Sequence, residues 1–136
     1  MLRDSITDPL RRWFAANGAG LVAAYLFGSV ARGQERHDSD VDVAVVLGRR
    51  RGPELADLDR LAEMQQQLSQ LLQRPVDLVP LDGASPDLCH HVLVDHVLLL
   101  DGGHDARIEF EVRQHHAYDD LEPFLRDYRR RVLEKA

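Results

Sequence analysis

Two short apolar segments joined by a polar stretch constrain the fold of this chain more than any other feature. The first, LVAAYLF, ends at Phe27 and leads directly into Gly28-Ser29. The second, VDVAVVL, begins just after Asp40 and carries Asp42 at its second position. Side chains alternate between the faces of a strand, so Asp40 and Asp42 should point to one face, roughly 6–7 Å apart at Cα. The two segments predict two strands with a turn at Gly28-Ser29.

Paired carboxylates at the start of a strand repel each other unless a cation neutralises them. Mg²⁺ binds carboxylate oxygens together with substrate phosphates, which makes it the expected occupant. A solvated turn before a strand is the alternative, since Ser-Asp is common there too. Ten residues separate Ser29 from Asp40. With Gly-Ser at this spacing, we interpret Asp40 and Asp42 as ligands of a metal–nucleotide site.

The Gly-Ser turn supplies candidate phosphate-binding groups. Gly28 lets the backbone approach a phosphate closely, and a helix that begins there offers free N–H groups and a favourable dipole. The Ser29 hydroxyl adds a donor, although Ser29 would also suit the N-cap of an ordinary strand-to-helix turn. Arg32 could reach phosphate or pair with a carboxylate. We add Gly33, which would end this helix, and Ser39, which could orient the first aspartate, to the predicted nucleotide-binding residues.

Asp77 lies within VDLVP, which reads as a further strand. A carboxylate among apolar neighbours is unfavourable on a buried strand unless it is paired or bound to metal. The alternative is an edge strand on which Asp77 faces water. Both possibilities stay open at the level of the residues.

Turn and capping signals divide the rest of the chain into alternating helices and strands. Strands are predicted over residues 21–27, 41–47, 76–80 and 96–100, and helices from Asp8-Pro9 to Gly18, over 53–73 and 85–94, and over about 105–135 with an interruption at Pro123. We expect one α/β (α+β) domain, residues 1–136, with a small mixed sheet of about four strands covered by helices. In the helix over 53–73, an apolar stripe is predicted from Leu55, Leu58, Ala62, Leu68, Leu71 and Leu72.

Composition limits the possible partners. A length of 136 residues suits one core, and a net charge of −6 argues against direct nucleic-acid binding, which favours a basic surface. The acidity indicates either solubility or docking to a basic protein. No segment resembles a signal peptide or a membrane span, and the single Cys89 fits a cytoplasmic setting.

Two other clusters receive weaker interpretations. The seven histidines do not follow zinc spacings, so zinc is not expected. The basic run Arg49-Arg50-Arg51 could contact phosphate or an acidic partner, but a solvated loop is the simpler interpretation.

The segments GSVARG and SDVDVAVVL resemble the minimal nucleotidyltransferase (MNT) branch of the DNA polymerase β-like nucleotidyltransferase superfamily. The resemblance implies the polymerase β-like fold over about residues 8–102, with a C-terminal helical extension over about 104–135. It also implies a third acidic residue on a neighbouring strand, which Asp77 matches. Asp40, Asp42 and Asp77 would then bind two Mg²⁺ ions, with ATP as substrate. Tyr118-Asp119-Asp120 is similar to a segment of MNT antitoxins and is assigned no catalytic role.

Members of this branch are commonly antitoxins of HEPN-domain ribonuclease toxins. The resemblance therefore implies transfer of AMP from ATP to a tyrosine of the toxin, which inactivates it. One alternative is nucleotide transfer to a small molecule, as in aminoglycoside nucleotidyltransferases, but those enzymes carry a further helical domain. Another is neutralisation by binding alone, which the intact Gly28, Ser29, Asp40, Asp42 and Asp77 disfavour.

Overall fold

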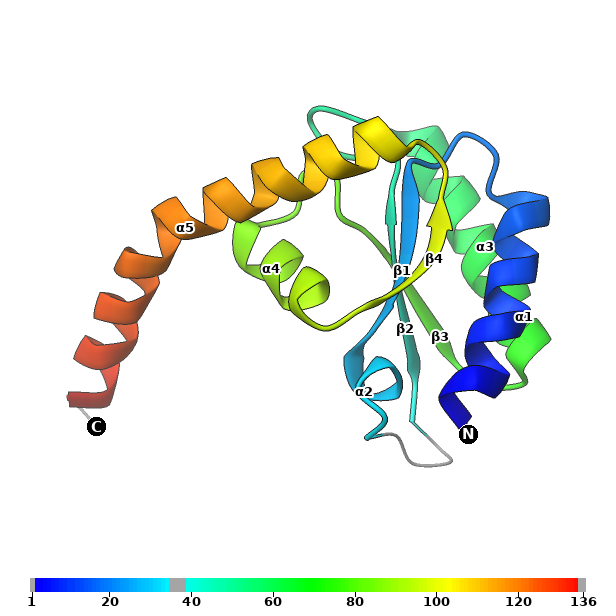
Figure 1. The fold of residues 1–136 in the computed structure, drawn as a ribbon, viewed down its shortest axis with the longest axis horizontal. Helices are drawn as coiled ribbons and strands as arrows, with labels where there is room; N and C mark the ends of the chain where they lie inside the picture. The colour runs from blue at the N-terminus through cyan, green and yellow to red at the C-terminus, as the bar shows by residue number, and fades with distance from the viewer. Residues whose placement is uncertain (1, 35–38, 135–136) are drawn as a thin grey trace.

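A four-stranded mixed sheet organises the chain (Figure 1). The computed structural model describes residues 2–34 and 39–134. The elements, in chain order, are α1 (Leu2–Asn17), β1 (Ala23–Phe27), α2 (Gly28–Ala31), β2 (Val41–Val46), α3 (Leu55–Leu72), β3 (Val76–Pro80), α4 (Pro86–Val94), β4 (Val97–Asp101) and α5 (His104–Glu134). The strand order is β3-β2-β1-β4. The predicted small mixed sheet covered by helices is confirmed.

Strand pairing makes the sheet mixed and sets the register that matters for function. β1 runs antiparallel to both β2 and β4, whereas β2 and β3 are parallel. Asp42 on β2 therefore lies opposite Phe27 on one side and Asp77 on the other. β3 is an edge strand.

Alternation along β2 separates two hydrophobic layers. Val41, Val43 and Val45 pack with buried residues of α1 and α3, while Ala44 and Val46 pack with buried residues of α4 and α5. Figure 1 shows the same division, with α1 and α3 on one side of the sheet and α4 and α5 on the other. Because Asp42 lies two residues before Ala44 on the same strand, its side chain points to the face that α4 and α5 cover.

The first turns of α5 are held to the sheet by a polar network. Tyr25 of β1 is buried, and its hydroxyl donates to Glu111 Oε1 at 3.1 Å. Burial, with Glu111 beside it, raises the pKa of Tyr25 well above its ordinary value. Arg107 donates to the same carboxylate at 2.9 Å and pairs with Asp101 at 3.2 Å. These contacts fix the direction in which α5 leaves the sheet.

Pro9 and Pro123 both lie inside helices, whereas the sequence predicted a helix start at the first and an interruption at the second. α1 begins at Leu2 rather than at Pro9, which lies within the helix. Burial of Ile6 against the core supports these seven additional helical residues, 2–8. α5 continues through Pro123 instead of breaking there, and its axis bends between its two halves (Figure 1). A proline removes one helical hydrogen bond, which produces a kink where both halves remain helical.

The apolar stripe predicted for α3 is correct at Leu68 and at half-buried Leu72 but wrong at its other positions. The helix buries Leu61, Met64 and Leu68, whereas Leu55, Leu58 and Leu71 are exposed. Leucines occur on two sides of this helix, so the sequence spacing alone did not identify the side that meets the sheet. Across residues 2–34 and 39–134, no helix combines the length and apolar character needed to span a bilayer.

Candidate active site

Three aspartates meet at the end of the sheet where β2 and β3 begin. Asp42 and Asp77 are paired in the parallel register, each as the second residue of its strand. Asp40 immediately precedes β2. Asp42 is half-buried, while Asp40 and Asp77 are exposed. The structure thus brings the three predicted carboxylates together, although Asp77 lies on an edge strand rather than on a buried one.

The electrostatics of Asp42 reflect this crowding. Burial raises the pKa of Asp42, and the neighbouring charges of Asp77 and Asp40 raise it further. Arg32 and His91 act in the opposite direction. The net effect still disfavours the ionised form of Asp42, because burial and repulsion from two carboxylates outweigh the two positive groups. A bound cation would relieve this imbalance.

Gly28 is required by the position of Asp42. Its φ is +78°, a conformation that L-residues rarely adopt. A Cβ at this position would lie 2.2 Å from Asp42 Oδ2. The antiparallel pairing of Phe27 with Asp42 produces this approach, because α2 begins directly after Phe27. The close approach seen here is between Gly28 and a carboxylate; the approach to phosphate stays a prediction.

Ser29 and Arg32 both lie beside the cluster on the α2 segment. Ser29 is within α2, and Phe27 occupies the N-cap position, so the N-cap alternative for Ser29 is wrong. Arg32 is exposed and donates from Nε to Gln34 Oε1 at 3.3 Å. Its positive charge lowers the pKa of Asp42. A contact of Arg32 with phosphate or with a carboxylate stays a prediction.

Gly33 and Ser39 flank the connection between α2 and β2. Gly33 has a φ of +69° and closes the turn by donating its N–H to the Val30 carbonyl at 3.1 Å. The Ser39 carbonyl accepts a hydrogen bond from Arg74 Nε at 3.1 Å, which anchors the chain just before Asp40. Nucleotide contacts by Gly33 and Ser39 stay predictions.

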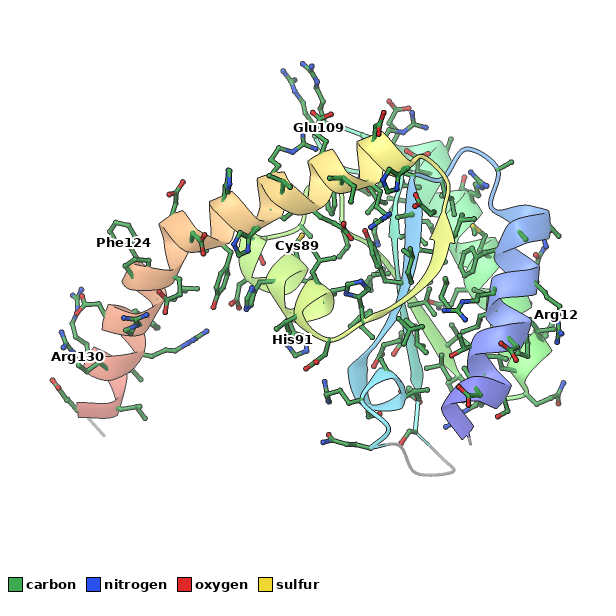
Figure 2. The ribbon with its side chains drawn as sticks, viewed as in Figure 1. Arg12, Cys89, His91, Glu109, Phe124 and Arg130 are labelled. Carbon is green, nitrogen blue, oxygen red and sulfur yellow. The ribbon has the colours of Figure 1, made fainter. Side chains whose placement is uncertain are left out.

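His91 and Arg74 are two residues near the site that the sequence did not single out for it. His91 is on α4, and Figure 2 shows it on the side of that helix that faces α2. Arg74 directly precedes the segment that leads into β3 and supports Ser39. The pair His90-His91 and the pair Arg74-Pro75 were visible as sequence features. Neither pair carries a local signal for proximity to Asp42, because that proximity comes from packing.

The basic run 49–51 lies at the other end of β2 from Asp42. Arg49 donates to both carboxylate oxygens of Asp57, at 2.9 and 3.0 Å. Buried Asp82 accepts the backbone N–H groups of Leu47, Gly48 and Arg49 at 2.7–2.9 Å. The loop interpretation of this run is therefore correct, and a contact with phosphate at the aspartate cluster is not compatible with its position.

The three aspartates offer suitable oxygen donors for a divalent metal, but their side chains do not form a complete coordination site. Within the described segments 2–34 and 39–134, no three His, Cys, Asp or Glu side chains are already arranged to hold one ion. The carboxylate oxygens are the ligands that Mg²⁺ prefers. Asp40 and Asp77 are exposed, so their carboxylates can reorient toward a cation. The raised pKa of Asp42 indicates a cluster in which a cation would be stabilising.

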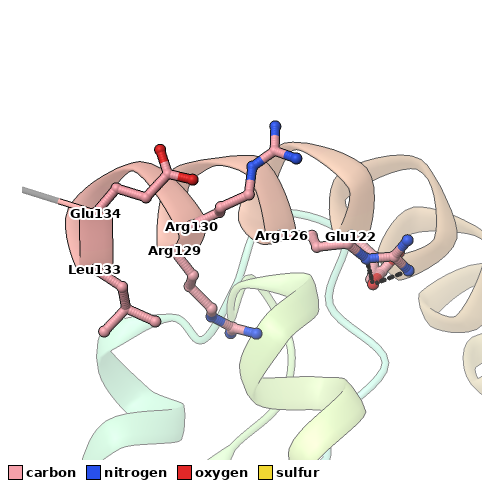
Figure 3. Close-up of a pocket in the computed structure, with 6 residues that line it drawn as sticks. All are labelled: Glu122, Arg126, Arg129, Arg130, Leu133 and Glu134. Atoms are coloured by element: carbon pink, nitrogen blue, oxygen red, sulfur yellow. Dashed lines mark hydrogen bonds and ion pairs between the residues drawn. The ribbon is translucent and has the colours of Figure 1, made fainter.

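A concavity of about 450 Å³ lies along the outer turns of α5 (Figure 3). It is lined by Glu122, Arg126, Arg129, Arg130, Leu133 and Glu134. All six residues come from one helix, and Arg126 is already paired with Glu122. This surface shares no residue with the aspartate cluster.

Comparisons with known proteins agree with this geometry. Protein adenylyltransferase MntA of Shewanella oneidensis is 41% identical over 76 residues, which are 54% of this chain and 49% of that protein. The aligned region thus spans about half of that relative. A chain in a crystal structure described as the toxin-antitoxin with AMP-PNP superposes with a TM-score of 0.67 at 26% identity, covering 90% of this chain and 97% of that one.

A second structure, described as tri-AMPylated Shewanella oneidensis HEPN toxin in complex with MNT antitoxin, contains a chain with a TM-score of 0.63. It is 24% identical and covers 93% of this chain and 98% of that one, so this likeness shows the fold alone. The family described as Polymerase beta, Nucleotidyltransferase matches residues 12–104, which include all three aspartates and the Gly-Ser turn. The chain belongs to the polymerase β nucleotidyltransferase family.

Proposed function

We propose that this protein is a Mg²⁺-dependent protein adenylyltransferase that acts as an antitoxin. The observation that carries the proposal is the pairing of Asp42 with Asp77, beside Asp40 and against Gly28, in a family of nucleotidyltransferases. The relative named protein adenylyltransferase supports a protein acceptor. The similar chain in a toxin–antitoxin structure with AMP-PNP, an ATP analogue, supports ATP as the nucleotide.

Asp40, Asp42 and Asp77 would hold two Mg²⁺ ions. Bound Mg²⁺ would neutralise the carboxylates and stabilise the negative charge that develops on the phosphates. The oxygen of the acceptor tyrosine forms a bond to the α-phosphorus, the bond to the bridging oxygen breaks, and pyrophosphate leaves. Asp77 is exposed beside Asp42 and would accept the proton of the attacking hydroxyl.

The α2 segment would bind the triphosphate. Gly28 and Ser29 would present backbone N–H groups and one hydroxyl to the phosphates, and Arg32 would add a positive charge at the edge of the cluster. Gly33 and Ser39 would shape the rim of the same site. Each of these residues is within one turn of α2 or adjacent to Asp40 in the chain.

The proposed acceptor is a tyrosine of a HEPN-domain ribonuclease toxin. The MNT sequence motifs and the toxin–antitoxin description of the similar chain support this partner. Residues 8–102 would form the transferase core of a single domain, and residues 104–135 the extension available to the partner. A cytoplasmic setting is proposed, because the single Cys89 cannot form an internal disulfide. AMP attached at or near the toxin's RNA-cleaving site would add charge and bulk there.

The decisive experiment is label transfer from α-³²P-ATP with Mg²⁺ to the purified product of the adjacent reading frame. We expect label on that protein with the wild type and none with the Asp40→Asn/Asp42→Asn double variant. Leu55→Asn, on the exposed side of α3, is the matched control and should label normally. A stable complex without label would favour neutralisation by binding alone. Label on an aminoglycoside but on no protein would favour a small-molecule acceptor.

A further inference from the structure

A groove of about 470 Å³ separates α4 from the middle and outer parts of α5. We call it the α4–α5 groove and define it by Asp87, Leu88, His91, Val94, Tyr118 and Arg129. It has walls from two helices, unlike the concavity in Figure 3, which one helix forms alone. A bound molecule in this groove would therefore be contacted from two sides.

Two contacts hold the helices that flank the α4–α5 groove. The rings of His90 and Tyr118 stack with centroids 3.6 Å apart and planes 4° from parallel. Further along, Arg129 reaches back from α5 to Asp87 at the start of α4, at 3.7 Å. The stack gives Tyr118 a structural role between the two helices. These contacts set the separation of the walls without filling the space between them.

One end of the groove approaches the aspartate cluster. His91 lines the groove and is close enough to Asp42 to lower the pKa of that carboxyl. Figure 2 shows His91 on the side of α4 that faces α2, the helix that begins at Gly28. An acceptor group at the His91 end would thus be close to the carboxylates, while its flanking residues could extend along α4.

The composition of the groove favours a polypeptide. Leu88 and Val94 line the groove and are 37% and 60% exposed, which suits contact with apolar side chains of a partner. Asp87 and Arg129 contribute one charge of each sign. A polycationic aminoglycoside would require an excess of acidic groups, and a nucleic acid an excess of basic groups. The groove supplies neither excess.

We propose that the α4–α5 groove docks the segment of the partner protein that carries the acceptor hydroxyl. This inference rests on the proposed protein adenylyltransferase function and adds the acceptor subsite to it. Leu88 and Val94 contact the apolar side chains of the segment. Asp87 and Arg129 exchange part of their mutual ion pair for charges on it. His91 marks the end at which the acceptor hydroxyl meets the aspartate cluster.

The test is a charge placed on the wall of the groove. Val94→Glu should raise the KM for the purified partner protein about tenfold, the change for a contact of about 1.4 kcal/mol. The kcat at saturating partner and the affinity for MgATP, measured by calorimetry, should change less than about twofold. Leu55→Glu is the matched control, because Leu55 is 78% exposed on α3, on the other side of the sheet. That variant should leave all three quantities unchanged.

Two outcomes overturn the inference. A Val94→Glu enzyme with the same KM as Leu55→Glu would show that the partner docks elsewhere. A weakened affinity for MgATP would assign the groove to the nucleotide. If Val94→Glu does not fold, Leu88→Glu on the same wall decides by the same criteria. Absence of label with the wild type would refute the proposed function itself, and this result differs from the others because they all require an active wild type.

Discussion

Gly28→Ala tests whether the carboxylate of Asp42 must remain where the structure places it. The new Cβ would lie 2.2 Å from Asp42 Oδ2, where real Cβ contacts essentially never fall below 3.0 Å, so the carboxylate must move by about 0.8 Å. The φ of +78° adds a backbone cost of about 1–2 kcal/mol for an L-residue. The loss of glycine flexibility in the unfolded chain offsets about 0.4–1 kcal/mol of that cost.

These magnitudes predict that function fails before folding does. A net backbone cost of about 1 kcal/mol leaves a small domain folded, because typical stabilities are about 5–15 kcal/mol. Displacement of a catalytic group by nearly an ångström reduces rates about 10²-fold. Label transfer by Gly28→Ala should therefore fall by about 10²-fold at 25 °C, while urea unfolding still gives one cooperative transition.

Gly20→Ala provides the matched control for this experiment. Gly20 has a φ of +87°, and the nearest atom to a Cβ there is Arg60 Nη1 at an ordinary 3.8 Å. It should show the same loss of stability with unchanged transfer. The reasoning is refuted if Gly28→Ala transfers label within threefold of the Gly20→Ala rate, or if both variants lose activity equally.

Three further predictions concern protonation and buried hydrogen bonds. Folding raises the pKa of Asp42, so the stability of the wild type declines as pH rises through that pKa. Metal-free Asp42→Asn should therefore be more stable than the wild type in urea unfolding at pH 7. A less stable variant would contradict the argument. Asp82→Ala removes the acceptor for three backbone N–H groups at residues 47–49 and should cost about 3 kcal/mol; an unchanged urea midpoint would exclude this role. Hydrogen bonds from Arg49 and from the Glu54 backbone N–H lower the pKa of Asp57 to about 2. The stability lost in Arg49→Met at pH 7 should therefore vanish as pH falls from about 4 to 2, and a pH-independent difference would argue against the pair.

Local signals predicted several elements closely. The strand Val76–Pro80 and the helix Pro86–Val94 have the predicted bounds. Ser85 caps that helix by accepting the Leu88 N–H at 3.2 Å. These predictions succeeded because a cap, a proline at the first helical turn and an apolar run act within a few residues of each other. Cys89 is buried, as expected for a small apolar-like side chain.

Predictions that depended on which side of an element meets the core succeeded less well. The α3 face was misassigned, since burial falls on Leu61 and Met64 instead of Leu55 and Leu58. For Asp77 the sequence left a buried strand and an edge strand open, and the structure shows the edge strand, because β3 lies at the end of the sheet and Asp77 is exposed. In each case the strand or helix was present, but its neighbours in space determined what was buried.

The residues of the candidate site were readable in the chain, because the spacing of Gly28, Ser29, Asp40 and Asp42 reflects a turn and a strand that are close in sequence. Their assembly required the tertiary fold. The parallel register brings Asp77 beside Asp42 across a connection that contains all of α3, and the packing of α4 brings His91 near Asp42. Pairing between strands and packing of helices depend on contacts between distant parts of the chain, and local propensity carries no information about them.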